Sequence, residues 1–241
     1  MHTEEVISTK RDIVEDIKEV LAFYGALGLE GLPINSEKRI MGKKEASERP
    51  PRATFRHKEA GLTKLREDIG NCKKCKLFQK RTNVVFGEGN PHARLMFIGE
   101  APGREEDLQA RPFVGEAGML LTRLIEKMGF KREDVYIANV LKCRPPMNRD
   151  PEADEIGQCR EYVEKQIEII SPAVIMTLGR ISAQTLIGNT KLRMTAIRGK
   201  HFDYKGIPLI PTFHPAYLLR NPRDKWLTWD DAQKVLERLK T

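Results

Sequence analysis

From about residue 60 onward, short apolar runs alternate with longer segments of helical periodicity, and this alternation constrains the fold most strongly. The apolar runs predict buried strands at residues 95–98, 135–140, 173–178 and 206–212. Apolar positions recur at helical spacing over residues 116–128, 151–170, 180–187 and 224–239. Strands that alternate with helices favour a parallel sheet with helices on both faces. We therefore expect an α/β fold, with its chemistry at the carboxyl ends of the strands.

The first 60 residues follow a different pattern. Apolar positions predict an amphipathic helix over about residues 4–25, and residues 30–58 have the charged, Pro- and Gly-containing composition of a flexible linker. We therefore predict two parts: an N-terminal helix with its linker, residues 1–60, and a main domain, residues 61–241. Packing on the main domain and docking to a partner protein, such as a replication or repair protein, both remain open for the helix.

The charge of the chain is concentrated in the main domain. The net charge is +8, and residues 1–59 carry as many acidic as basic side chains, so the whole excess falls on residues 60–241. A basic domain favours a polyanionic partner such as nucleic acid, although solubility explains the charge equally well. There is neither an apolar run long enough to span a membrane nor an apolar signal segment at the N-terminus. We expect a cytoplasmic protein without a membrane partner.

Four cysteines, Cys72, Cys75, Cys143 and Cys159, indicate a metal site. Structural disulfides are disfavoured in a reducing cytosol, and four cysteines with none left over fit a tetrathiolate site for zinc or for an iron–sulfur cluster. The spacing does not distinguish between these metals. Neighbouring cations would offset the negative charge of the thiolates: Lys73, Lys74, Lys76, Lys142 and Arg144. The alternative, a thioredoxin-like redox pair at the first two cysteines, leaves the other two unexplained.

The loop after the first predicted strand combines glycines, carboxylates and an aromatic ring. Residues 99–107 include Glu100 and Glu106, and residues 111–115 include Phe113. Glycines permit close approach of a ligand, although a solvated turn would have the same composition. The loop lacks the Lys of a P-loop and the G-x-G-x-x-G spacing, which argues against binding of a nucleoside triphosphate or a dinucleotide.

The second predicted strand ends at Asn139. Its amide offers a donor and an acceptor together, as the reading of a base edge requires, and a turn-forming role is equally compatible. Nearby Asn148 lies in a Pro-rich loop, where local capping is the default interpretation.

The last predicted strand leads into residues 212–222. His214 precedes a proline, which favours an extended backbone. Leu218 and Leu219 beside Arg220 are either core residues with a surface charge, or the apolar wedge and phosphate contact of proteins that push into a duplex.

In this order, and with the four cysteines, the three loops resemble the uracil-DNA glycosylase superfamily, most closely its thermostable, iron–sulfur-containing family four. The matching segments are GEAPGREED with RPFVGEAG, then NVLKCRPP, then HPAYLLR, and the resemblance covers about residues 62–240. It implies a three-layer α/β/α sandwich around a four-stranded parallel sheet, and a [4Fe–4S] cluster on the four cysteines. It also implies an enzyme of base excision repair that hydrolyses the N-glycosidic bond of uracil in DNA and leaves an abasic site.

The same resemblance implies roles for the loop residues. Phe113 would stack on the flipped uracil, Asn139 would hydrogen-bond its Watson–Crick edge, and His214 would donate toward O2. Glu100 would position the attacking water, with Glu106 and Asn148 as supporting polar groups.

Further positions carried over are Gly99 and Ala101, which would line the uracil site, and a loop that would insert where the base has left, comprising Leu218, Leu219 and Arg220. Ala101 stands where the best-known branch of the superfamily has a water-activating Asp.

Three alternatives remain at this point. One is a glycosylase of wider range that also accepts hypoxanthine or xanthine, or one restricted to mispaired uracil. Another is a non-catalytic binder of uracil or abasic DNA, and the third is a redox-sensing nucleic-acid module. In every case we expect a monomer whose main partner is DNA, single- or double-stranded.

Overall fold

The computed structural model describes residues 52–240, with side chains from residue 57 onward. The expected N-terminal helix and most of the expected linker lie outside these residues. Helix α2 (Arg52–Ile69) includes residues 52–58, so the linker interpretation is wrong for that stretch. Leu62, Leu65 and Ile69 are buried at helical spacing along it. The helix therefore continues across the expected boundary at residue 60.

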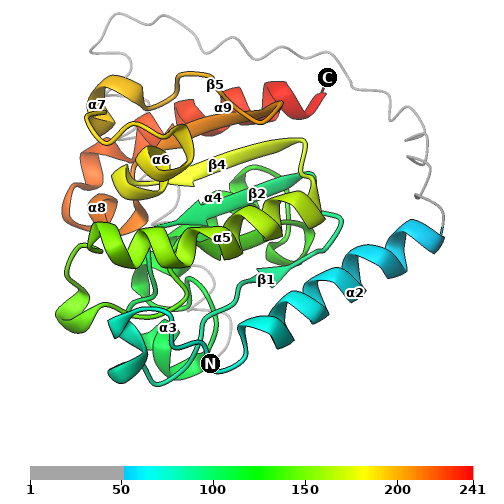
Figure 1. Ribbon diagram of the computed structural model, residues 1–241. Helices are drawn as coiled ribbons and strands as arrows, with labels where there is room; N and C mark the ends of the chain where they lie inside the picture. The colour runs from blue at the N-terminus through cyan, green and yellow to red at the C-terminus, as the bar shows by residue number, and fades with distance from the viewer. Residues whose placement is uncertain (1–51, 241) are drawn as a thin grey trace, which may run out of the picture. The chain divides into compact units, whose positions relative to one another are not determined.

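The core of the fold is one sheet of six strands in the order β1-β3-β2-β4-β6-β5 (Figure 1). The four central strands are parallel: β2 (Leu95–Gly99), β3 (Tyr136–Asn139), β4 (Val174–Leu178) and β6 (Ile207–Thr212). The strands β1 (Glu88–Gly89) and β5 (Phe202–Tyr204) add antiparallel edges. The expected α/β class is confirmed, with four parallel strands at its centre. The expected strand count is too low, because two- and three-residue edges leave no periodic pattern in a sequence.

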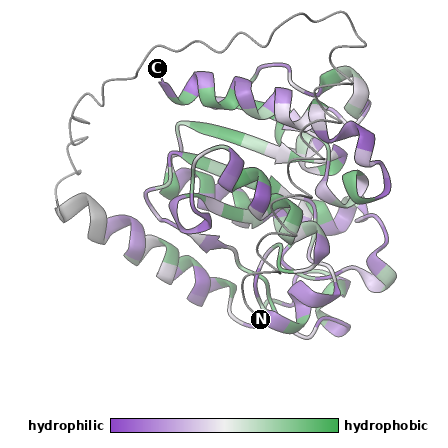
Figure 2. Ribbon diagram, turned by 180° about the vertical axis from the view of Figure 1, so that it is seen from behind, coloured by the Kyte–Doolittle hydropathy of each residue, from purple (hydrophilic) through white to green (hydrophobic). Residues whose placement is uncertain are grey.

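Helices cover both faces of the sheet. Successive strand residues point to opposite sides, so Met96 and Ile98 join one core and Leu95 and Phe97 join the other. The first core is closed by α2, α5 (Ala153–Ile170) and α6 (Arg180–Ile187). The second is closed by α4 (Glu116–Lys127) and α9 (Lys225–Lys240). In Figure 2, α2 and α9 alternate between hydrophilic and hydrophobic residues, as expected of helices with one face on a core. The result is a three-layer α/β/α sandwich.

Short helical segments, which the sequence pattern did not predict, complete the described chain. They are α3 (Arg104–Gln109), α7 (Met194–Ile197), α8 (Pro215–Arg220), and the 3-10 turns η1 (Lys76–Gln79), η2 (Arg132–Asp134), η3 (Pro146–Asn148) and η4 (Pro222–Asp224). Segments of three to six residues are too short to establish a helical period. Within residues 52–240, no helix has the length and apolar character needed to cross a membrane.

The register of the parallel strands places their carboxyl ends at one edge of the sheet. Gly99 at the end of β2 pairs with Asn139 at the end of β3, and Leu178 pairs with Thr212 in the same way. The loops that follow these strands therefore meet at that edge, as the general rule for open α/β sheets predicts.

Candidate active site

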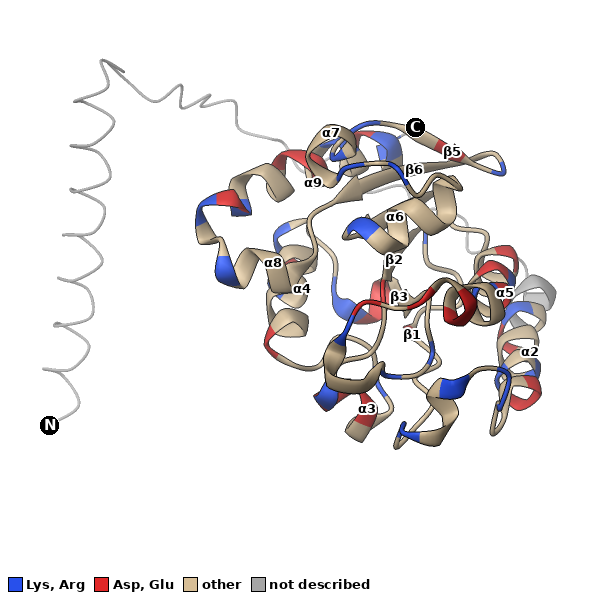
Figure 3. Ribbon diagram, turned by 60° about the vertical axis from the view of Figure 1, so that its left-hand side comes forward, with Lys and Arg blue, Asp and Glu red and all other residues tan. Residues whose placement is uncertain are grey.

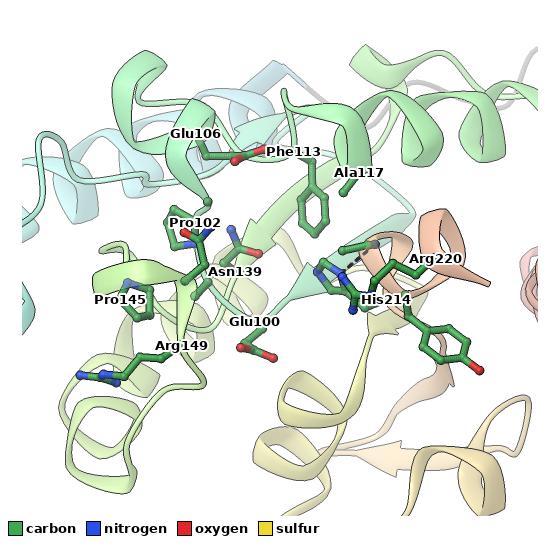
Figure 4. Close-up of a pocket in the computed structure, with 15 residues that line it drawn as sticks. Glu100, Pro102, Glu106, Phe113, Ala117, Asn139, Pro145, Arg149, His214 and Arg220 are labelled. Atoms are coloured by element: carbon green, nitrogen blue, oxygen red, sulfur yellow. Dashed lines mark hydrogen bonds between the residues drawn. The ribbon is translucent and has the colours of Figure 1, made fainter. Parts of the chain in front are cut away.

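A pocket of about 400 Å³ opens at the carboxyl edge of the sheet (Figure 4). Residues from all three strand-end loops identified in the sequence line this pocket. The expected site residues that line it are Glu100, Ala101, Glu106, Phe113, Asn139, Asn148, His214 and Arg220. Residues more than 100 positions apart in the chain thus share one cavity.

Asn139 forms the polar floor of the pocket. It is 2% exposed, and its Oδ1 is buried without a hydrogen-bond partner. Gly99 lies directly beneath, because a Cβ at position 99 would come within 2.4 Å of both Asn139 Oδ1 and Phe113 Cζ. Only glycine leaves this space open. A buried acceptor without a partner is costly in a folded protein, so the floor is shaped for a ligand that brings a donor.

Phe113 is held above this floor by an unusual backbone. Its φ of +51° is a left-handed conformation that bulky residues rarely adopt. One carboxylate oxygen of Glu106 accepts from the backbone N–H groups of Val114 and Gly115, each at 2.9 Å, and so fixes the turn. Gly118 of α4 packs against the Phe113 backbone, where a Cβ would lie 2.0 Å from its carbonyl. In this structure Glu106 therefore acts on the position of the ring.

His214 presents one defined nitrogen to the pocket. It is the N-cap of α8, and its Nδ1 accepts from the backbone N–H of Ala216 at 3.1 Å. Nδ1 therefore carries no proton, and the neutral ring carries its proton on Nε2. Burial, with the nearby positive charge of Arg220, lowers the pKa of His214 to about 4, against the opposing effect of Glu106. The imidazole is thus a neutral donor throughout the physiological pH range.

Among the described residues, Glu100 and Glu106 are the two carboxylates that line the pocket, and both are drawn in Figure 4. Burial and the negative charge of Asp150 raise the pKa of Glu100 to about 7, and Arg180 partly opposes them. Its pKa is therefore set mainly by burial, and the charges of Asp150 and Arg180 adjust it. A carboxylate with this pKa is poised to ionise near neutral pH.

Asn148 lies at the rim and is already engaged. It is exposed, and its Oδ1 accepts from Arg144 Nε at 2.8 Å. Arg149, which sequence reasoning missed, also lines the pocket and forms an ion pair with Glu155.

The segment expected to insert into DNA is helix α8, and its two leucines differ. Leu218 is 3% exposed, whereas Leu219 is 39% exposed. The expected insertion of Leu218 is at odds with this placement, because its side chain packs in the protein interior. Leu219 and Arg220 face solvent, and Figure 3 shows further basic residues on the turn that follows α8. The exposed end of α8 is therefore the part available for contact with a phosphate backbone.

The four cysteines lie together, away from the residues that line the pocket at the carboxyl edge of the sheet. All four are free thiols and line one small cavity. Three sulfurs receive donors: Arg81 donates to Cys143 Sγ at 3.2 Å, the backbone N–H of Lys142 donates to Cys159 Sγ at 3.2 Å, and the Tyr162 hydroxyl lies 3.5 Å from Cys72 Sγ. Burial raises the pKa of Cys159 to about 12. Among residues 57–240, no three His, Cys, Asp or Glu side chains converge closely enough to hold a single metal ion.

Comparison with known protein families identifies the family of this chain. Residues 86–240 match the model of the uracil DNA glycosylase superfamily. Every strand-end loop that lines the pocket lies within this range. The chain belongs to the uracil-DNA glycosylase superfamily.

Individual members of the superfamily are similar over most of their length. The Type-4 uracil-DNA glycosylase of Sulfurisphaera tokodaii is 48% identical over 73% of this chain and 84% of its own. That of Thermotoga maritima is 51% identical, over 64% and 81% respectively. That of Archaeoglobus fulgidus is 44% identical over 73% and 92%.

Some residues that support this glycosylase pocket carry no sequence signal. Arg132 donates to the Pro112 carbonyl and pairs with Glu88, and these contacts hold the turn before Phe113 in place. Lys142 and Gln166 form a buried pair behind Asn139. A lone Arg, Lys or Gln in a helix or loop resembles an ordinary surface residue, so only the fold identifies these supports.

Proposed function

We propose that this protein hydrolyses the N-glycosidic bond of uracil in DNA, leaving an abasic site, as a monofunctional enzyme of base excision repair. The observation that carries the proposal is the buried Oδ1 of Asn139, which lacks a partner and lies over Gly99 next to the Phe113 ring. A flat ring with a hydrogen-bonding edge is the ligand that satisfies both surfaces. Membership in the superfamily supports the same function.

Recognition of the base rests on Asn139 and Phe113. The Asn139 amide accepts from N3–H of uracil through Oδ1 and donates to O4 through Nδ2. Cytosine presents the reverse pattern at these two positions and would leave buried polar groups unpaired. The Phe113 ring stacks on the extruded base, which every base-flipping enzyme must first remove from the duplex.

Departure of the base requires stabilisation of negative charge on uracil. His214 donates from Nε2 toward O2, and its low pKa keeps it a neutral donor. Preorganised donors directed at a developing anion are worth about 10²–10³ in rate each. Asn139 provides a second donor at O4.

Attack by water takes place beside Glu100. The ionised carboxylate holds the water and stabilises the positive charge that develops on the sugar, as carboxylates do in glycosidases. Ala101 offers no group for this task, and Asn148 and Glu106 already accept hydrogen bonds from the protein. Glu100 is therefore the carboxylate we assign to the water.

Binding of DNA uses the exposed end of α8. Leu219 fills the space that the flipped base leaves, and Arg220 contacts a phosphate. The net charge of +8 adds salt-dependent attraction for the backbone.

We also assign a [4Fe–4S] cluster to Cys72, Cys75, Cys143 and Cys159. The donor set supports it, because four free thiols line one cavity and cysteine thiolates are the ligands that hold such clusters. Lys142 fits such a site: it is 1% exposed, burial lowers the pKa of its amino group to about 7, and negative charge on the neighbouring Cys159 and Cys143 opposes that shift. The cluster would tie α5 to the loops at residues 72–75 and 143, and would supply no reacting atom to the pocket.

The direct test is release of free uracil from an oligonucleotide with one deoxyuridine, followed by alkaline scission at the abasic site. We expect scission at the deoxyuridine and an intact strand in the thymidine control. Tight binding without release would instead favour a non-catalytic binder. Activity that follows the oxidation state of the cluster would favour the redox module.

A further inference from the structure

Lys142 is buried without an acidic partner. Among residues 57–240 it is the one lysine with a buried side chain, at 1% exposure. Its Nζ donates to the backbone carbonyl of Asn139 at 2.8 Å and to Gln166 Oε1 at 2.6 Å. Both acceptors are neutral, so the ammonium is bonded but not paired with a carboxylate in the described chain. Burial of a lysine side chain without a carboxylate partner is costly and calls for a reason.

The first acceptor links Lys142 to base recognition. Asn139 is the last residue of β3, and its carbonyl leads into the loop that follows. The next two backbone N–H groups, of Val140 and Leu141, bond to the carbonyls of Gly99 and Glu100. Lys142 bonds the carbonyl of Asn139 itself. It thereby fixes the peptide plane from which the Asn139 amide projects.

The second acceptor anchors Lys142 to the body of the fold. Gln166 of α5 accepts from Lys142 through Oε1, while its Nε2 donates to the Phe86 carbonyl at 2.8 Å and lies 3.2 Å from the Tyr136 hydroxyl. The backbone carbonyl of Lys142 also accepts from the N–H of Val85 at 2.8 Å. Every polar group of this network has a partner, which makes it rigid.

The backbone of Lys142 reaches the cysteine site. Its N–H donates to Cys159 Sγ at 3.2 Å, and Cys143 is the next residue in the chain. One residue therefore contacts both the floor of the base pocket and the thiols behind it.

We propose that Lys142 is a positioning residue for Asn139: its side chain holds the Asn139 carbonyl from behind and so sets the geometry of base recognition. This inference rests on the proposed function. A long side chain with a strong donor is needed to reach the Asn139 carbonyl from behind.

The test is a double-mutant cycle between Lys142→Met and Asn139→Ala, measured as the single-turnover rate of uracil release. Lys142→Met should lower the rate about 10- to 100-fold, the effect typical of residues that orient another group. In the Asn139→Ala background the same substitution should change the rate less than about twofold, because interacting residues are non-additive. Affinity for a duplex with non-hydrolysable 2′-fluoro-deoxyuridine and the visible absorbance of the holoprotein should stay near wild type.

Controls separate positioning from general damage. Lys165→Met removes an exposed lysine of α5 next to Gln166 and should leave the rate unchanged. Lys142→Gln removes the charge but keeps a donor, and should show a smaller loss with the same non-additivity. If Lys142→Met does not fold, Lys142→Gln decides the question.

Two results would overturn the inference: a wild-type rate in the Lys142 variants, or losses that add fully to that of Asn139→Ala. Failure of the proposed function would be seen differently, as the absence of uracil release by the unmodified protein.

Discussion

Among residues 57–240, the base pocket and the cysteine site share no lining residue, and they are built in opposite ways. In the pocket, a buried acceptor of Asn139 has no partner and Phe113 is held in a left-handed backbone conformation. At the cysteine site, three of the sulfurs receive donors from the protein. This contrast supports both proposals: a base that enters and leaves the pocket, and a cluster that stays bound to the cysteines. Changes to the pocket should therefore affect rate, and changes to the cysteines should affect stability.

The largest effect is expected from Asn139→Ala. Removal of the amide deletes the recognition of the base edge and one donor to the departing uracil, so single-turnover release should fall about a thousandfold. Duplex affinity, colour and melting temperature should stay close to wild type. Cleavage near the wild-type rate would remove Asn139 from the pocket chemistry.

Cys143→Ala should have the opposite profile. Cys143 is buried and accepts from Arg81, so its loss would remove a proposed cluster ligand from the interior. Because metal binding contributes to folding free energy, the variant should lose its visible absorbance and melt at a lower temperature. A colourless wild-type preparation that contains zinc would refute the cluster, and an unchanged melting temperature would contradict the structural role.

The leucines of α8 form a matched pair for the same comparison. Leu218→Ala creates a cavity in the interior and should lower the free energy of unfolding by about 2–5 kcal/mol. Leu219→Ala should leave stability unchanged and slow uracil release about tenfold, equivalent to about 1.4 kcal/mol. Chemical denaturation and single-turnover kinetics distinguish the two, and an exchange of these phenotypes would mean that Leu218 is the inserting residue.

The smallest effect concerns pH. The pKa of Glu100 is raised to about 7, so the rate should increase with pH through that value as the carboxylate ionises. Asp150→Asn removes a negative charge that raises this pKa and frees Arg180 from its ion pair, so the rise should move to lower pH by less than about one unit. His214, with a pKa of about 4, should not contribute in this range. A shift to higher pH would exclude Glu100 as the titrating group.

The sequence predicted the parts of this molecule that depend on periodicity. The central parallel strands and the helices α4, α5, α6 and α9 were expected from apolar spacing, and all lie within a few residues of the predicted ranges. The gathering of strand-end loops at one edge was also predictable, because parallel strands end together.

The rest depends on tertiary contacts that no local pattern records. Leu218 and Leu219 are adjacent leucines, and only the docking of α8 decides which one is buried. The conformation of Phe113 depends on Glu106 and on the close approach of Gly118. In the sequence, Lys142 cannot be distinguished from a solvent-exposed lysine, and only the fold shows that Gln166 of α5 lies beside it.

The central claim is that Asn139 and Phe113 form a slot that admits an extruded uracil and rejects other pyrimidines. Single-turnover release of uracil, cytosine and thymine from otherwise identical oligonucleotides tests it most directly. The account predicts rapid release of uracil and no detectable release of the other two bases. Retention of uracil by folded, cluster-loaded protein, or release of cytosine at a comparable rate, would contradict it.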